Sequence, residues 1–319
     1  MSEVKLDPEE IFSAGLLLRT GTDPTREICG SPPRLTRVRM GEYVETHRWA
    51  ELSAGERHRA LVLATVRRMR GADQIVSHLS AAAVWEMPII GAWPARVHVT
   101  MDALAAGSSA LISRHRISRM PEGVERHGIV VTSPARTVVD IARTSCLASA
   151  LTAADWTVRN GLCTLAEIDC EVDAIEPGRR GRVGAQALQL LVDPRSQSPG
   201  ESLSRARMYE LGFAQPSLQV PLEDGRGEFG AADFGWPGAI GEFDGERKYR
   251  ATGDAGDTAS EDVVIKEKKR EDRIRRTRVQ VARWCWSDAL PPGAEGMVAA
   301  LQAVGLSPQG SPWSPYPRD

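Results

Sequence analysis

The sequence predicts an α+β fold divided into several domains. At 319 residues the chain is long for one domain and comfortable for two or three, each able to bury its own core. Helical periodicity alternates with short strand-like runs, and the turn-rich stretch 193–200 separates two helical patterns. We expect a winged helix-turn-helix-like region over 1–50, a second α+β region over 51–192, and a mixed sheet flanked by helices over 196–319.

Composition and charge are those of an ordinary globular protein. Hydrophobic residues make up 42% of the chain and charged residues 26%, and the net charge of -2 gives no global attraction to nucleic acid. The five cysteines lack Cys-x-x-Cys or zinc-finger spacing, so we expect neither a disulfide framework nor a structural zinc site. The acidic start has no apolar segment and no run reaches the length of a membrane span, so we expect a cytoplasmic protein.

The first region is expected to consist of short helices followed by a strand. A helix-like pattern over 8–19 ends at a Gly-Thr-Asp-Pro break, and a second short helix follows. Basic and apolar residues then alternate over 34–44, as in a wing strand with a basic face. In a winged helix-turn-helix, that face would bind nucleic acid through Arg34, Arg37 and Arg39. The alternative is a helical cap with a solvated basic strand.

The second region should mix strands with helices gathered at its end. Ser53 and Glu56 form a capping box that opens a helix running to about residue 70. Ser133 and Pro134 supply an N-cap and a first-turn proline for another helix. The remaining expected elements are helices over 78–86, 147–160, 164–173 and 182–191, and strands over 95–100, 112–117 and 124–131.

All six histidines precede residue 128, so chemistry in the last region cannot use a histidine base or ligand. Carboxylates and lysine remain there. In the second region, four histidines (His78, His98, His115 and His127) share no metal-ligand spacing, and we expect each to have a structural role.

The third region should form a meander joined to a last strand by a helical crossover. A capping box at Ser198 and Glu201 starts a helix that ends at Gly212. Strands are then expected over 217–222, 229–236 and 240–244, a helix over 260–278 and a strand over 279–286. Because a helix connects it, we expect the last strand to run parallel to a strand of the meander.

Three carboxylates are expected to share one face of this sheet. If Pro237 and Gly238 are the central turn residues, paired positions sum to 475, so Asp233 lies opposite Glu242. Alternation then puts Asp244 on the same face. Opposed like charges destabilise a hairpin, so the arrangement calls for a divalent cation or a cationic substrate group.

These residue types fit metal-dependent phosphodiester hydrolysis. Asp233 and Glu242 can hold a hard cation such as Mg²⁺, which activates water without histidine. Lys248 is a candidate for holding the water or a phosphate oxygen, the alternative being a solvated lysine. Glu201 is a candidate fourth acid, although its position in the capping box explains it equally well.

The helix after the meander is unusually basic. Between residues 263 and 283 there are nine Lys or Arg residues, among them Lys268, Lys269 and Arg270. Such a helix either contacts phosphates or presents a solvated charged face.

Residues 196–290 resemble the PD-(D/E)XK, or restriction-endonuclease-like, superfamily. The resemblance rests on Ala232-Asp233-Phe234-Gly235-Trp236-Pro237, Gly241-Glu242-Phe243-Asp244-Gly245, the segment 267–272 and the element order. These segments look most like bacterial domains allied to very-short-patch repair endonucleases. The resemblance implies a nuclease fold with an acidic Mg²⁺ site, with Asp244 standing where the superfamily usually has lysine.

A second resemblance covers about residues 8–175. The segments Ser77-His78-Leu79-Ser80-Ala81-Ala82-Ala83-Val84-Trp85, Val97-His98-Val99-Thr100 and 132–140 look like AbiEi-type antitoxins of type IV toxin-antitoxin systems. That resemblance implies a DNA-binding regulator with a cognate toxin protein as a partner.

Together these features predict a cytoplasmic, DNA-associated protein with a Mg²⁺-dependent endonuclease site of Asp233, Glu242, Asp244, Lys248 and Glu201. Two alternatives remain open. One is a non-catalytic DNA-binding regulator or antitoxin, and the other is a toxin-antitoxin partner with no DNA contact.

Overall fold

A computed structural model describes residues 5–69, 74–102, 109–117, 120–245, 270, 272–274, 276–277, 279–290, 292–310 and 312–316. Helices and mixed sheets build the α+β fold that the sequence predicts. The chain forms two compact units, the first made of residues 1–145 and 166–185 and the second of residues 146–165 and 186–319. Among the described helices, none combines the length and apolar character needed to cross a membrane.

The first unit begins with a small three-stranded sheet and short helices. Its elements are β1 (Phe12–Ser13), α1 (Ala14–Arg19), α2 (Pro24–Cys29), β2 (Leu35–Arg39), β3 (Glu42–Glu45) and α3 (Thr46–Glu51), and the strand order is β1-β3-β2. Two expectations are corrected here. Residues 8–19 form a 3₁₀ turn, a strand and a helix, and residues 34–44 form a hairpin because Gly41, with φ +79°, turns the chain.

A five-stranded sheet in the order β6-β5-β4-β8-β7 forms the rest of the first unit. The strands are β4 (Gln74–Val76), β5 (Val97–Asp102), β6 (Ile112–Ile117), β7 (Gly123–Arg126) and β8 (Ile129–Thr132), and the helices are α4 (Ala54–Val66), α5 (His78–Trp85), α6 (Pro134–Thr144) and α8 (Leu165–Asp173). The predicted caps at Ser53 and Ser133 are confirmed. The single strand expected over 124–131 is a hairpin, because His127 and Gly128 both adopt positive φ.

α5 packs against α4, α6 and β5, so the middle of this unit is a helix that the sheet and two other helices cover. The helix is apolar nearly all round, and Ala81, Ala82 and Val84 are fully buried. Trp85 at its end donates a hydrogen bond from Nε1 to the carbonyl oxygen of Thr132, at 2.9 Å. α5 thereby fixes the position of its first residue, His78, inside the unit.

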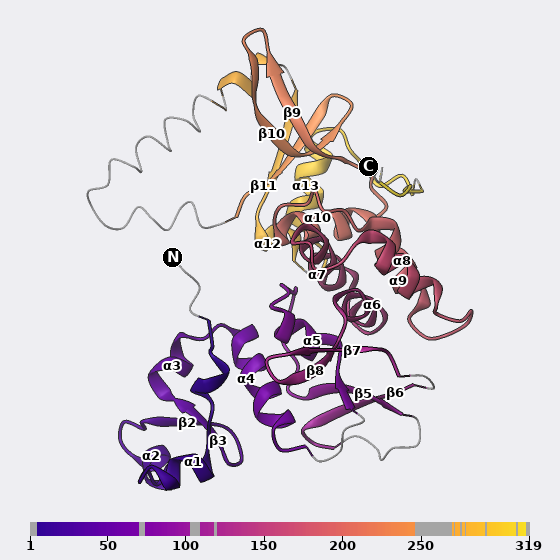
Figure 1. The fold of residues 1–319 in the computed structure, drawn as a ribbon. Coiled ribbons are helices and arrows are strands. Elements are labelled where there is room, and N and C mark those ends of the chain that lie inside the picture. Colours follow the sequence, from indigo (N-terminus) through magenta and orange to yellow (C-terminus); the bar gives the residue numbers. More distant parts are fainter. Residues whose placement is uncertain are drawn as a thin grey trace, which may run out of the picture. The chain divides into compact units, whose positions relative to one another are not determined.

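The second unit is a mixed four-stranded sheet in the order β12-β11-β10-β9 with helices around it. Its elements are α7 (Leu147–Arg159), α10 (Pro199–Glu210), β9 (Ser217–Asp224), β10 (Gly227–Trp236), β11 (Ala239–Phe243), β12 (Gln280–Trp284), α12 (Trp286–Ala289) and α13 (Glu295–Ala303), and α9 (Arg182–Leu191) enters it. Figure 1 shows the β9–β10 hairpin extending away from α10, α12 and α13. β12 runs parallel to β11, which confirms the predicted parallel pairing, and most of the expected helix 260–278 lies outside the described residues.

A buried ion pair joins α7 to α10 inside the second unit. Arg205 donates from Nη2 to Asp155 Oδ2 at 2.9 Å, and both side chains are almost fully buried. Ser202 and the backbone N–H of Asp193 also donate to the Asp155 carboxylate. The turn-rich stretch expected to separate domains therefore lies within this unit.

Candidate functional site

The predicted hairpin and its register are present. Three strand pairs, Phe234 with Gly241, Gly235 with Ile240 and Trp236 with Ala239, all sum to 475. Gly238 has a φ of +81°, which only glycine adopts without cost, so the turn falls at Pro237 and Gly238. The two strands therefore bring Glu242 beside Asp233, as the sequence predicts.

Asp233 is a carboxyl of the sheet whose charged form is disfavoured by its surroundings. Its Oδ2 accepts a hydrogen bond from the backbone N–H of Phe243 at 2.8 Å. Burial, followed by the negative charge of Glu201, raises the pKa of Asp233 to about 6, and the charge of Glu242 adds to the shift. Three acids from α10, β10 and β11 thus face one another closely enough to repel.

Glu201 is buried, with 6% of its surface exposed, in the first turn of α10. Its Oε2 accepts hydrogen bonds from the backbone N–H of Gln197 at 2.8 Å and from Nε2 of Gln219 at 3.0 Å. Ser198 caps the helix by accepting from the N–H of Glu201, but the Glu201 carboxylate bonds Gln197 instead of completing the capping box. The backbone N–H of Glu201 therefore takes part in the helix cap, but its carboxylate does not and can belong to the acidic cluster.

Two arginines hold Glu242. Arg283 donates from Nε to Glu242 Oε2 at 2.9 Å, and Arg270 contacts Oε1 in a short ion pair. Arg270 also donates to the carbonyl oxygen of Ala231, which ties it to β10. β12 supplies Arg283 because its parallel register places that residue opposite Glu242. The sequence did not predict that either arginine would form an ion pair with Glu242.

The remaining predicted residues contribute unequally. Asp244 follows β11, where its backbone N–H donates to the carbonyl oxygen of Trp284, and its Oδ1 is buried without a hydrogen-bond partner among the described residues. Lys248, Lys268 and Lys269 lie outside the described residues. Within the described parts of the chain, no three of the carboxylates at this site offer oxygens that all lie within 4.8 Å of one another.

An open hollow of about 560 Å³ adjoins Glu201. It is lined by Arg159, Pro194, Arg195, Gln197 and Gln219. Gln197 and Gln219 are hydrogen-bonded to each other at 3.0 Å, and both also contact Glu201. The hollow is thus lined by two arginines and by the two glutamines that contact Glu201, and Arg195 is itself paired with Asp193 at 2.7 Å.

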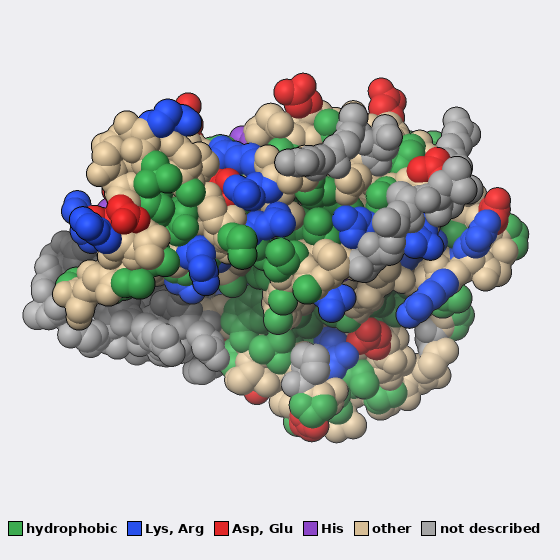
Figure 2. Space-filling view, turned by 90° about the horizontal axis from the view of Figure 1, so that it is seen from below, with side chains coloured by type: hydrophobic (Ala, Val, Ile, Leu, Met, Phe, Trp, Pro, Cys, Tyr) green, Lys and Arg blue, Asp and Glu red, His purple; other side chains and the backbone are tan. Residues whose placement is uncertain are grey.

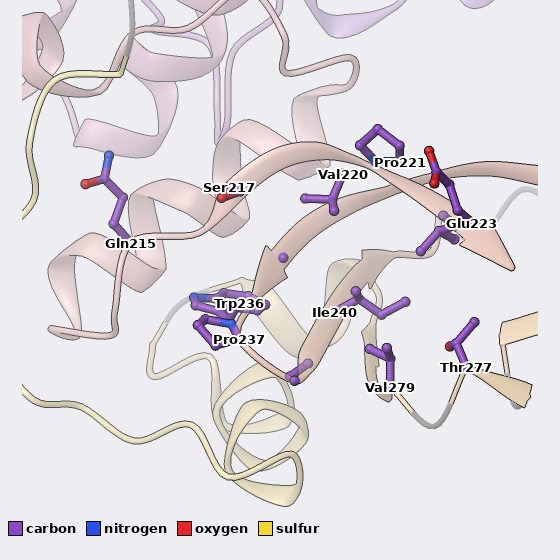
Figure 3. A pocket seen from close by; sticks show the side chains of 14 residues that line it. Gln215, Ser217, Val220, Pro221, Glu223, Trp236, Pro237, Ile240, Thr277 and Val279 are labelled. Atoms are coloured by element: carbon purple, nitrogen blue, oxygen red, sulfur yellow. The ribbon is translucent and has the colours of Figure 1, made fainter. Parts of the chain in front are cut away.

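A second cavity of the same unit is separate from the acids. It measures about 470 Å³ and lies along β9, the β10–β11 turn and the start of β12, with Val220, Ile240 and Val279 among its lining residues (Figure 3). Asp233, Glu242, Asp244 and Glu201, the predicted catalytic residues that the structure describes, are not among its lining residues. Its walls are mostly aliphatic and lack convergent charge, so we do not assign the site to it.

The expected basic face of the first region is only partly formed. Arg34 and Arg37 on the β2 hairpin are exposed, with Arg34 3.6 Å from Glu27. Arg39 instead donates from Nη1 to the carbonyl oxygen of Thr65 at 3.0 Å, and burial lowers the pKa of its guanidinium. The strand alternation fails at Arg39 because the register of β2 against β3 shifts between Arg37 and Arg39.

The structure also brings together residues that the sequence pattern did not connect. His78, His98 and His115 each offer a ring nitrogen, and these three atoms all lie within 4.8 Å of one another. The expectation that each of these histidines has a structural role stays a prediction, but the structure places the three side by side. They come from α5, β5 and β6, and their spacing of twenty and seventeen residues matches no local metal motif. The available signal was that His98 and His115 each lie on an expected strand, and the structure pairs these two strands in one sheet.

No family model matches the chain, and no solved structure matches it. Two curated relatives are the uncharacterized proteins MT2308 and Rv2248 of two Mycobacterium tuberculosis strains. Each is 38% identical over 110 residues, which is 34% of this chain and 40% of the relative. The chain thus matches less than half the length of these relatives.

Proposed function

We propose that the second unit hydrolyses phosphodiester bonds of nucleic acid with the aid of a divalent cation held by its acidic cluster. The observation that carries the proposal is the position of Asp233, a mostly buried carboxyl whose pKa is raised to about 6 by burial and by two neighbouring acids. Such an arrangement costs folding free energy unless a cation or a proton neutralises it. Strongly perturbed acids in this setting are typical of functional sites.

The donor set suits a hard cation. Mg²⁺ prefers oxygen ligands and is commonly held by one or two carboxylates with water completing its shell. Asp233 and Glu201 are the residues that would hold it, and Glu242 would join them on release from its arginines. When bound, the cation supplies positive charge for the phosphoryl group and lowers the pKa of a water molecule.

The chain's own residues would position the substrate. Arg159 and Arg195 line the hollow beside Glu201 and would donate hydrogen bonds to a phosphate of the nucleic-acid backbone, Arg195 in exchange for its ion pair with Asp193. The Gln197–Gln219 pair fixes the Glu201 carboxylate through two hydrogen bonds. The N–H of Phe243 stabilises the ionised form of Asp233. The lysine role remains a proposal for Lys248, outside the described residues.

Cleavage of supercoiled plasmid in Mg²⁺ or Mn²⁺ tests this proposal. We expect nicking by the wild type and a loss on the order of 100-fold or more in Asp233→Asn, because the substitution removes a charged ligand. Glu228→Gln is the matched control, since Glu228 is an exposed acid on the same strand. Equal cleavage by wild type and Asp233→Asn would overturn the catalytic assignment.

One observation favours a second candidate, a non-catalytic DNA-binding regulator or antitoxin. Arg270 and Arg283 neutralise the charge of Glu242, so this carboxylate needs no metal ion to balance it. Figure 2 shows Lys and Arg side chains scattered among hydrophobic and acidic ones over the face seen from below. In this role the second unit would bind nucleic acid or a partner such as a cognate toxin, with Mg²⁺ unnecessary.

Gel shift on the DNA upstream of the protein's own gene tests the regulator. We expect binding that weakens as salt rises and that Arg34→Ala with Arg37→Ala reduces, because both side chains are exposed. Arg179→Ala, an exposed arginine paired with Glu176, is the control. Binding that does not respond to salt or to the paired substitution would count against DNA contact through this hairpin.

A further inference from the structure

The three clustered histidines of the first unit form a site that the proposed function does not use. His98 Nδ1 and His115 Nε2 lie 3.1 Å apart. The rings of His78 and His115 stack with their centroids 3.5 Å apart. The ring centroids of His78 and His98 are 5.8 Å apart. β5 and β6 run side by side in parallel, which brings His98 and His115 to one place in the sheet.

The separation of one pair of these nitrogens matches a transition-metal site, and the His78 ring, which stacks on that of His115, would have to turn for both to bind the same ion. A tetrahedral zinc ion with Zn–N bonds of 2.0–2.1 Å separates its ligand nitrogens by about 3.3 Å. The separation of His98 Nδ1 and His115 Nε2 is close to that value, and the third nitrogen lies within 4.8 Å of both.

Two further features set this cluster apart from ordinary core histidines. His78 has a φ of +55°, a left-handed conformation that costs free energy for a residue with a side chain. Asp140 is 2% exposed, and its Oδ2 is buried with no hydrogen-bond partner among the described residues, 3.9 Å from His78 Nδ1. A strained backbone at His78 and a buried carboxylate oxygen without a hydrogen bond are both expected at a site that binds an ion or small molecule.

The cluster also opens onto a basic pocket. A cavity of about 310 Å³ is lined by His78, His115 and Asp140 together with arginines, including Arg136, Arg143 and Arg180. Arg136 is paired with Asp140 and Glu171. Guanidinium groups repel a bare cation but attract an anion, so a metal bound here would be favoured when its remaining position carries a negatively charged ligand.

We propose that His78, His98 and His115 bind one divalent transition-metal ion of the zinc class, and that its open coordination position takes an anion from the arginine-lined pocket. Three histidines with one open position is the arrangement of a reactive rather than a purely structural zinc site. The site is independent of the acidic cluster, since its residues belong to the first unit.

Cobalt(II) titration of the full chain tests this proposal, because cobalt substitutes for zinc and its visible absorption reports the ligand set. We expect one ion per chain, bound with the intense visible bands of low coordination number, and a shift of those bands on adding azide. His98→Ala and His115→Ala should each weaken binding by more than about 100-fold, since even outer partners of a ligand matter by 10–100-fold. His47→Ala is the control, an exposed histidine 3.6 Å from Glu45.

Absence of bound cobalt in the wild type, or equal binding by the three variants, would overturn the proposal. Unshifted bands in azide would overturn the open anion position. If the alanine variants fail to fold, His115→Gln retains a hydrogen-bonding side chain, and the wild type's zinc content after dialysis decides the question. A content near zero contradicts the site, and one ion per chain, lost in His115→Gln but kept in His47→Ala, supports it.

Discussion

At the scale of single residues, Asp233 is a carboxyl of the second unit whose charged form is disfavoured by its neighbours. The hydrogen bond from the N–H of Phe243 favours its charged form, but burial and the charges of Glu201 and Glu242 disfavour it more strongly. The result is a carboxyl that stays ionised at neutral pH at a cost in free energy of folding. A cation would remove that cost, which links the residue's ionisation to ligand binding.

Asp233→Asn should therefore make the protein more stable at alkaline pH. The folded pKa of about 6 lies above the ordinary 3.8, so the folded state resists ionisation. The penalty is present above about pH 6, fades as pH falls toward 3.8 and is absent below it. We expect the free energy of unfolding to rise by about 1–3 kcal/mol at pH 8 and to change little at pH 3.5.

Denaturant unfolding of wild type, Asp233→Asn and Glu228→Gln at the two pH values checks this. Glu228→Gln should change little at either pH, because its side chain is exposed. A destabilised Asp233→Asn at pH 8 would show that Asp233 holds the fold together and is not strained by its neighbours. Cleavage by the wild type should likewise decline as pH falls, because a proton on Asp233 competes with the cation.

At the scale of elements, the hairpin of β10 and β11 was the most predictable part of the site. Turn chemistry at Pro237 and Gly238 fixes the register, and the register fixes which acids meet. The helix start at Ser198 and the parallel pairing of β11 with β12 followed from capping and crossover rules. Local pattern determines these features, so the sequence alone sufficed for them.

Other features depend on contacts between distant segments and had no local signal. The arginine pair on Glu242 needs the parallel register of β12, and the histidine cluster needs three elements to meet. The predictions of single strands over 34–44 and 124–131, where the structure has hairpins, failed for a different reason. Their turns use Gly41 and the His127–Gly128 pair inside otherwise regular alternation, so the strand pattern continues through the turn.

The approach of α10 to β11 should control the acidic site. A methyl group at Gly200 would lie 2.0 Å from the ring of Phe243, so only glycine allows the helix start to sit this close. Gly200→Ala should therefore lower the free energy of unfolding by about 1–3 kcal/mol and displace Glu201 from Asp233. Divalent-cation affinity should fall with it.

Thermal unfolding with and without Mn²⁺ measures both effects of Gly200→Ala. Gly225→Ala is the control, since a methyl group there meets nothing within 4 Å. If Gly200→Ala unfolds like wild type and keeps the same Mn²⁺ response, the close packing of α10 on β11 does not set the geometry of the site.

At the scale of the whole molecule, each unit has its own core and its own cluster of polar residues. The first contains the histidines and the arginine-lined pocket, and the second contains the acids and the hollow with Arg159 and Arg195. The pairing of Asp155 with Arg205 makes α7 an integral part of the second unit, although residues 166–185, which follow α7 in the chain, belong to the first unit. A fragment beginning near residue 196 would leave Arg205 buried without its partner, so functional tests should use the full chain.

The central claim is that the acidic cluster takes up a divalent cation in exchange for the arginines on Glu242. A crystal structure of the full chain grown with saturating Mn²⁺, analysed by anomalous diffraction, tests it most directly. We predict a Mn²⁺ peak bound to Asp233 and Glu201, with Arg270 moved away from Glu242. No peak at Asp233, with Arg270 and Arg283 still paired to Glu242, would contradict the claim.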